Sequence, residues 1–366
     1  NLVDSSATIP VSASAGNGAV LGGTKSGSAT AGAFTFSNLK FTGLVGDYTL
    51  TYASTGLTSA TETVTLIYGT ATKLAVSTQP VGGNAAGDAL NTQPAVEIQD
   101  ADGNRVANST VTVTAAVDND ATGSLSEGNT TATAVAGVAK FTGVIVAGDS
   151  TRTYKLNFTS GSLTAAASND LTFVNADAAS LEVTRAAATV KAGIAFGTQP
   201  KITILDRYGN VVTTGTSATA DIVVASNKGT LSGTKTVAAV AGVATFSDLS
   251  LAGTIATDYS LTFTAGTFTA TQSNITLGYG AADHLSVKTQ PVGGNKTGDL
   301  LAGQPEINVL DASNNVVGNS TTDVTVAVYN DATGSITAGA TVAAVNGVAT
   351  FTGVKLVGKP GTSYTL

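Results

Sequence analysis

The stretch Gly242-Val243-Ala244-Thr245-Phe246 has counterparts at Gly137-Val138-Ala139-Lys140-Phe141 and at Gly347-Val348-Ala349-Thr350-Phe351. The phenylalanines that end these stretches are 105 residues apart in both cases. A second marker has almost the same spacing and consists of Tyr48, Tyr154, Tyr259 and Tyr364. Self-similarity at a fixed period is typical of repeat architectures. The sequence therefore predicts a tandem array of units about 105 residues long.

The repeats fall into two alternating types. Residues 78–84 return almost unchanged at 289–295, which is 211 residues later, and the intervening repeat lacks this segment. We call the repeats that carry it type A and the others type B. The predicted domains are 1–70 (type B, N-terminally incomplete), 71–177 (type A), 178–281 (type B) and 282–366 (type A, C-terminally incomplete), below called the first to fourth repeats. The incomplete ends suggest a window on a longer array.

Strand patterns dominate each repeat. Residues 111–117, 201–205 and 323–328 alternate between apolar and polar side chains and are rich in β-branched residues. Residues 154–158 and 259–263 place Tyr, Leu and Phe on one face of a strand, which a second sheet must cover. No segment keeps apolar residues at helical spacing over three turns. The predicted fold class is all-β, with tandem immunoglobulin-like β-sandwich domains in an elongated array.

The order of motifs within a repeat resembles a known family. A Gln-Pro pair precedes an alternating strand, then come Asp-x-x-Gly-Asn, Gly-Val-Ala-x-Phe and Tyr-x-Leu-x-Phe. This order is similar to that of the bacterial Ig-like repeats found in adhesins of the invasin and intimin type and in surface-layer proteins. The resemblance covers nearly the whole chain, although no lectin-like or anchoring domain is visible. It implies a secreted, extracellular protein at the cell surface or in the cell envelope.

The composition excludes several kinds of chemistry. Among 366 residues there is no cysteine and only one histidine, which removes thiol nucleophiles, Cys-ligated metals and most Ser-His-Asp arrangements. The formal charge of -7 opposes binding to nucleic acid. Thr, Ser and Gly interrupt every apolar run, so no transmembrane segment is predicted. We therefore expect a protein that is not an enzyme.

One segment resembles the start of a calcium-binding loop. Asp100-Ala101-Asp102-Gly103-Asn104 has suitable oxygens, but its spacing is short and no glutamate follows at the twelfth position of the loop. The sister segments starting at Asp206 and Asp311 lack the middle carboxylate, which favours a hairpin turn with Gly or Asn at positive φ. A looser calcium site near the domain junctions stays open as an alternative. Calcium is the one cofactor considered, and its candidate ligands are Asp100, Asp102, Asp177 and Asp283.

The junctions between repeats are short and carry aromatic residues. Tyr68 and Tyr279 lie one superperiod of 211 residues apart, and we predict that they pack between adjacent domains. The lone histidine, His284, occupies the position that Lys73 has in the earlier type A repeat. This equivalence favours a polar junction residue over a catalytic or metal-binding role.

Six Asn-x-Ser/Thr sequences are candidate glycosylation sites. They start at Asn108, Asn129, Asn157, Asn274, Asn295 and Asn319. Asn108 and Asn319 are equivalent positions, 211 residues apart.

The sequence favours a structural, non-enzymatic protein that forms a surface layer, a sheath or an extended stalk. Its predicted partner is itself, through self-association into a filament, sheath or lattice. The first alternative is an adhesin that binds a host receptor or glycan, with these repeats as spacer or binder. The second is an accessory module of a secreted polysaccharide enzyme, which would require a catalytic domain outside this sequence. Exposed aromatic loops would favour binding, but Trp is absent and aromatic residues make up 5% of the chain.

Overall fold

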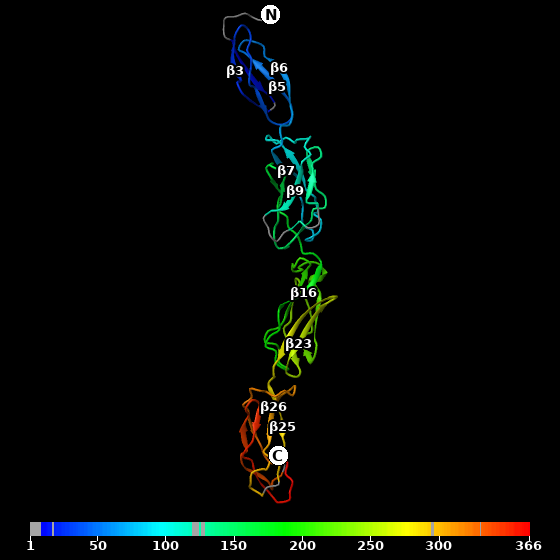
Figure 1. Cartoon of the computed structure of the whole chain (residues 1–366), viewed down its shortest axis with the longest axis vertical. Helices are drawn as coiled ribbons and strands as arrows, with labels where there is room; N and C mark the ends of the chain where they lie inside the picture. Colours follow the sequence, from blue (N-terminus) through cyan, green and yellow to red (C-terminus); the bar gives the residue numbers. More distant parts are fainter. Residues whose placement is uncertain (1–8, 17, 119–123, 126–128, 294–295, 330) are drawn as a thin grey trace. The chain divides into compact units, whose positions relative to one another are not determined.

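The computed structural model describes residues 9–16, 18–118, 124–125, 129–293, 296–329 and 331–366. The chain divides into two compact units, Asn1–Ala176 and Asp177–Leu366. Antiparallel strands form many small sheets, and the one helical element of the described residues is the 3₁₀ turn η1 (Thr216–Thr219). Figure 1 shows the strands of each repeat in sequence colours. The all-β fold class with tandem β-sandwich domains is confirmed.

The first unit holds the sheets of the first and second repeats. In the first repeat, the sheets have the orders β3-β1-β5-β6 and β2-β4. In the second, they are β12-β8-β7, β11-β9-β14-β15 and β10-β13. The strands are β1 (Ile9–Ala15), β2 (Val20–Gly22), β3 (Ser26–Ala29), β4 (Lys40–Thr42), β5 (Gly46–Ala53), β6 (Ala60–Leu66), β7 (Lys73–Thr78), β8 (Ala95–Gln99), β9 (Thr112–Val117), β10 (Ser124–Leu125), β11 (Thr131–Thr133), β12 (Val138–Lys140), β13 (Val146–Ala147), β14 (Leu156–Thr159) and β15 (Ala166–Ala167).

The second unit holds the sheets of the third and fourth repeats. In the third repeat, the orders are β16-β17-β21, β20-β18-β23-β24 and β19-β22. In the fourth, they are β25-β26-β30, β27-β29 and β28-β31. The strands are β16 (Ala178–Arg185), β17 (Lys201–Asp206), β18 (Asp221–Ser226), β19 (Thr230–Ser232), β20 (Thr236–Ala238), β21 (Val243–Thr245), β22 (Ser250–Ala252), β23 (Ala256–Ala265), β24 (Phe268–Leu277), β25 (Ala282–Thr289), β26 (Glu306–Asp311), β27 (Asp323–Thr325), β28 (Ser335–Ala338), β29 (Thr341–Ala343), β30 (Val348–Thr350) and β31 (Lys355–Val357).

The core of the third repeat follows from the alternation along its strands. Tyr259, Leu261 and Phe263 of β23 are buried, as predicted, while the residues between them face outward. The ring of Phe263 lies 5.6 Å from that of Phe246, the phenylalanine of the periodic Gly-Val-Ala-Thr-Phe stretch. The marker that reveals the period is therefore a core residue of the sandwich.

One predicted strand is shorter than expected. The alternating residues 323–328 form a strand only over Asp323–Thr325, where β27 pairs with β29. In the second repeat, the equivalent strand β9 extends to Val117 because its later residues pair with β14. Alternation predicts which face a side chain takes, whereas the length of a strand depends on its ladder partner.

The buried tyrosines make a hydrogen bond typical of immunoglobulin-like sandwiches. The hydroxyl of Tyr48 donates to a carbonyl oxygen four residues upstream, and the hydroxyls of Tyr154 and Tyr259 donate five residues upstream. The donor–acceptor distances lie between 2.6 and 3.0 Å. This is the contact of a tyrosine corner, which explains three of the four periodic tyrosines by packing and hydrogen bonding. Tyr364 differs: it is half-buried, and its hydroxyl accepts the Lys359 N–H at 2.6 Å.

Three of the Gln-Pro glutamines, at positions 93, 199 and 304, each join two loops. Gln199 Nε2 donates to the carbonyl oxygens of Phe196 and Leu249, and its Oε1 accepts the Leu249 N–H at 3.0 Å. Gln93 and Gln304 make the corresponding contacts. Each following proline directly precedes a strand, β8, β17 or β26, where its missing N–H costs no ladder bond.

Candidate functional site: the junction clamps

The site begins as a tight hairpin turn after β8. Oδ1 of Asp100 accepts the N–H groups of Asp102 and Asn104 at 3.0 and 2.9 Å. Gly103 has φ 91, the left-handed region that glycine adopts without strain. The equivalent turn positions are Gly209 with φ 81 and Asn314 with φ 65. The predicted hairpin turn, with Gly or Asn at positive φ, is thus confirmed.

The side chains of this turn also contact the preceding repeat. Asn104 Nδ2 donates to the carbonyl oxygen of Gly43 at 3.0 Å, and Asn104 Oδ1 accepts the Val45 N–H at 2.7 Å. The N–H of Gly69, in the linker, donates to Asp100 Oδ2 at 2.7 Å. Asp100 and Asn104 are themselves joined through Nδ2 at 3.0 Å. One hairpin of the second repeat therefore binds a loop of the first repeat and the segment that connects them.

The second unit contains the same arrangement between the third and fourth repeats. Asn315 Nδ2 donates to the Gly253 carbonyl oxygen at 2.9 Å, and its Oδ1 accepts the Ile255 N–H at 3.0 Å. The Gly280 N–H donates to Asp311 Oδ2 at 2.8 Å. We call each set of contacts a junction clamp. The first consists of Asp100, Asn104, Gly43, Val45 and Gly69, and the second of Asp311, Asn315, Gly253, Ile255 and Gly280.

The clamp carboxylates are buried but well supplied with donors. Asp100 is 3% exposed and Asp311 is 1% exposed. Burial by itself raises the pKa of the Asp311 carboxyl, but the N–H groups of Gly280, Asn315 and Ser313 outweigh this effect. The pKa of Asp311 therefore lies below its ordinary value, and that of Asp100 is lowered for the same reasons. These carboxylates stay ionised at neutral pH and hold the turns through charge-assisted hydrogen bonds.

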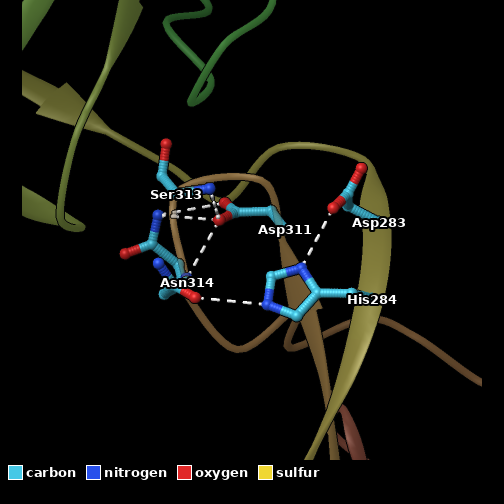
Figure 2. A network of polar contacts seen from close by, with 6 residues as sticks. Asp283, His284, Asp311, Ser313 and Asn314 are labelled. Carbon is cyan, nitrogen blue, oxygen red and sulfur yellow. Dashed lines mark hydrogen bonds and ion pairs between the residues drawn. The ribbon is translucent and has the colours of Figure 1, made fainter.

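The lone histidine extends the second clamp. Figure 2 shows the His284 ring between two partners: Nδ1 lies 3.0 Å from Asp283 Oδ2, and Nε2 lies 3.2 Å from Asn314 Oδ1. In the second repeat, the equivalent Lys73 donates to the carbonyl oxygen of Ala101, in the same turn, at 3.2 Å. Both side chains therefore connect the first strand of a type A repeat to its clamp hairpin.

The two junction tyrosines are half-buried. The ring of Tyr279 lies next to Gly318, whose Cα would place a Cβ 3.4 Å from Tyr279 Cε1. A linker residue thus contacts a loop of the fourth repeat. The packing role of Tyr68 and Tyr279 between domains remains a prediction.

The calcium candidates do not form one cluster. Asp100 and Asp102 share the first clamp hairpin, Asp177 is exposed, and Asp283 lies against His284. Within the described ranges, no three His, Cys, Asp or Glu side chains form a group that could hold a metal ion. Both oxygens of Asp100 already accept N–H donors. The described geometry of Asp100 is therefore that of a turn and a junction contact.

The glycosylation candidates differ in their surroundings. Asn108, Asn129, Asn274 and Asn319 are exposed, Asn157 is half-buried in β14, and Asn295 lies outside the described residues. Asn274 has φ 57 within β24. Asn108 and Asn319 follow the clamp hairpins in equivalent turns, so these two share one local structure.

Sequence reasoning missed the junction role of Asn104 and Asn315. It also missed their partners in the loops at Gly43 and Gly253, because a backbone N–H or carbonyl leaves no mark in the sequence. A signal was present in the hairpins: the last Asn is kept at Asn104, Asn210 and Asn315, although a turn alone requires only the first Asp and a residue with positive φ.

Acid is expected to loosen the clamps. Because the folded-state pKa values of Asp100 and Asp311 lie below those of the unfolded chain, the stability they contribute is present above about pH 4 and is lost as pH falls through the folded values. The amide proton resonances of Gly69 and Gly280 should shift together in an NMR titration below about pH 4. If both resonances stay unchanged while other carboxylates titrate, the carboxylates do not hold the linkers.

The two linker glycines are expected to respond differently to alanine. A Cβ at Gly280 would clash with the carbonyl oxygen of Ala192, whereas a Cβ at Gly69 would meet Asp100 Oδ2 at an ordinary 3.5 Å. Gly280→Ala should therefore destabilise the second unit by about 1–3 kcal/mol, while the matched control Gly69→Ala should change its own unit by less than about 0.5 kcal/mol. Chemical denaturation of each unit measures this difference, and equal effects would contradict the described packing at Gly280.

The fold places this chain in the all-β class, with tandem β-sandwich domains joined by recurring clamps. No protein-family profile matches the sequence, and no curated protein matches it. Among the described residues, no helix is long and apolar enough to span a membrane.

Several solved structures are similar to the chain. Domains 1–6 of the surface layer protein SbsC match with 15% identity and a TM-score of 0.26, over 97% of this chain and 45% of that one. SbsC domains 5–6 match with 18% identity and a TM-score of 0.21, over 59% of this chain and 99% of that one. A β-glucuronidase of Parabacteroides merdae matches with 11% identity and a TM-score of 0.20, over 54% of this chain and 24% of that one. The chain spans less than half the length of the SbsC domains 1–6 structure.

Proposed function

We propose that this protein is a structural, non-enzymatic component of a cell surface, where its Ig-like repeats form a surface layer, a sheath or an extended stalk. The observation that carries the proposal is the recurrence of one junction clamp, with equivalent residues, at both described type B to type A junctions. An equivalent asparagine therefore binds a loop of the preceding repeat at both junctions. In repeat proteins, such nearest-neighbour contacts determine stiffness.

The described surface supports a mechanical role. The lone histidine serves the clamp, and the buried carboxylates accept backbone N–H groups, so these side chains are used for structure. An adhesin site would be expected to present exposed aromatic side chains. Tyr329 is the one exposed aromatic residue in the part of the chain that the structure describes. The proposal therefore places self-association ahead of binding to a host receptor or glycan.

Electron microscopy of native cells and of the purified chain tests the proposed function. A periodic sheet or tube, labelled by an antibody against this chain, is the expected result. Isolated rods that end in a distinct head would instead support the adhesin. Chelator treatment belongs in the same experiment, because loss of assembly with a chelator would support a calcium requirement and unchanged assembly would contradict it.

A further inference from the structure

The large sheet of the third repeat has an outer face that is rich in threonine. Strands β23 and β24 place Thr262 opposite Thr271 and Thr264 opposite Thr269. Val223 of β18 lies between Thr264 and Thr236, and so extends the Thr264–Thr269 pair across the sheet. Ala225 lies opposite Thr262, and so extends the Thr262–Thr271 pair. We call these seven residues the threonine face: Thr236, Thr262, Thr264, Thr269, Thr271, Val223 and Ala225.

This face carries no charged side chain. The nearest charges are at strand ends, namely Asp221 at the start of β18 and the ion pair of Lys228 with Asp258. The opposite sheet of the same repeat differs, since β16 alone contains Glu182 and Arg185. A solvent-facing sheet surface is usually protected by charge against association with other sheets. The threonine face lacks this protection.

The arrangement of the threonines lowers the free energy needed to remove water from them. The hydroxyls of Thr262 and Thr271 are 3.2 Å apart and hydrogen-bond to each other. A hydroxyl that already has a partner loses less when water is removed than an unpartnered one. Threonine is also stiff at χ1, so little side-chain freedom is lost on contact. The face presents small, uncharged side chains to solvent, with Val223 46% exposed among them.

The same surface recurs in other repeats. In the second repeat, Thr112 pairs with Thr133 and Thr114 with Thr131 across β9 and β11. In the first, Thr49 pairs with Thr63 and Thr51 with Thr61 across β5 and β6. These threonines are exposed, except for the half-buried Thr51. A surface that is repeated along an array fits a partner that repeats in the same way.

We infer that the threonine face is a lateral docking surface for a second copy of this chain. Copies with a formal charge of -7 repel each other, and this repulsion is smallest where two copies meet through an uncharged face. A glycan or an oppositely charged protein would be recognised through aromatic or charged side chains, which the face lacks. This inference rests on the proposed self-association and names the surface that performs it.

Docking through the threonine face of a single repeat is weak, whereas docking through several repeats at once is strong. Strand spacing of about 4.8 Å and a rise of about 3.4 Å per residue give a four-stranded face only a few hundred Å². Stable interfaces bury about 800 Å² per partner, so one face is insufficient and several faces must engage together. Linked weak contacts reinforce each other through effective concentration, which makes assembly depend on the number of repeats.

The test compares charge substitutions on the two sheets of the third repeat in the full 366-residue chain. Thr262→Asp with Thr271→Asp charges the threonine face, and Thr271→Asp alone avoids placing two carboxylates opposite each other. The control, Thr184→Asp with Thr245→Asp, adds the same charge at exposed positions of the opposite sheet. Sedimentation velocity over a concentration series measures association, and circular dichroism confirms that each variant is folded.

We expect the wild-type chain and the control to associate at the same concentration, and both face variants to require at least about tenfold more protein. If the face variants associate like wild type, docking through the threonine face is contradicted, while the proposed function is left intact. A wild-type chain that stays monomeric at every concentration would overturn both.

Discussion

Asp311→Ala is expected to lower the free energy of unfolding of the second unit by about 2–4 kcal/mol, because buried N–H donors lose their only strong acceptor. Oδ2 of Asp311 accepts the N–H of Gly280, and Oδ1 accepts those of Ser313 and Asn315 at 2.8 and 2.9 Å. Gly280 and Asn315 are buried, so water does not replace the carboxylate for them. Urea denaturation of the unit Asp177–Leu366 within the intact chain measures the loss.

Two further variants separate the clamp from general effects of charge. Asp311→Asn retains one acceptor oxygen and should lose about half as much stability. Asp323→Ala removes the same charge from an exposed position of the same repeat and should cost less than about 0.5 kcal/mol. If Asp311→Ala and Asp323→Ala are equally mild, the carboxylate does not hold the junction.

Phe263→Ala is expected to cost about 3–5 kcal/mol, because a fully buried ring is replaced by a cavity. The loss should be confined to the third repeat, since in arrays of this kind stability is the sum of local repeat and interface contributions. Hydrogen exchange read by mass spectrometry resolves this: peptides from β17, β18 and β23 should lose protection, while those from β26 and β30 retain most of theirs.

Thr264→Ala is the matched control for the core substitution. It changes the next residue of the same strand, but on the outer face, and should cost less than about 1 kcal/mol. Equal loss of protection in the fourth repeat after Phe263→Ala would mean that the two repeats unfold as one cooperative block. The junction clamp would then couple stabilities as well as positions.

In the proposed array, the junction clamp and the threonine face have separate roles. The clamp fixes how a type A repeat follows a type B repeat, through side chains of one hairpin and backbone groups of the other repeat. The face offers an uncharged surface for lateral contact. The two devices use different residues, so their variants should separate loss of junction geometry from loss of assembly.

The core and the turns were predictable from the sequence for a physical reason. A buried strand face requires apolar side chains at every second position, and a turn at positive φ requires Gly or Asn. Phe246, Phe263 and Gly209 satisfy these local rules, so their roles follow from pattern alone. The hairpin at Asp100 was likewise identified by comparison with its sister turns.

The partners of the polar side chains were not predictable in the same way. Asn104 contacts Gly43 and Val45, about 60 residues away, through backbone groups that every residue has. The same holds for Gln199, which joins the carbonyls of Phe196 and Leu249. Equivalent side chains occur in the second, third and fourth repeats, but their contacts depend on which loops the fold brings together.

By itself, the sequence determined the period, the two repeat types, the all-β class and the inward-facing residues, since all of these rest on local periodicity and steric preference. Only the tertiary structure decided that the Asp and Asn of a turn also hold the neighbouring repeat, and that uncharged threonines from three strands form one continuous face. Both depend on registers and approaches between distant segments, which are set by packing of the whole sandwich.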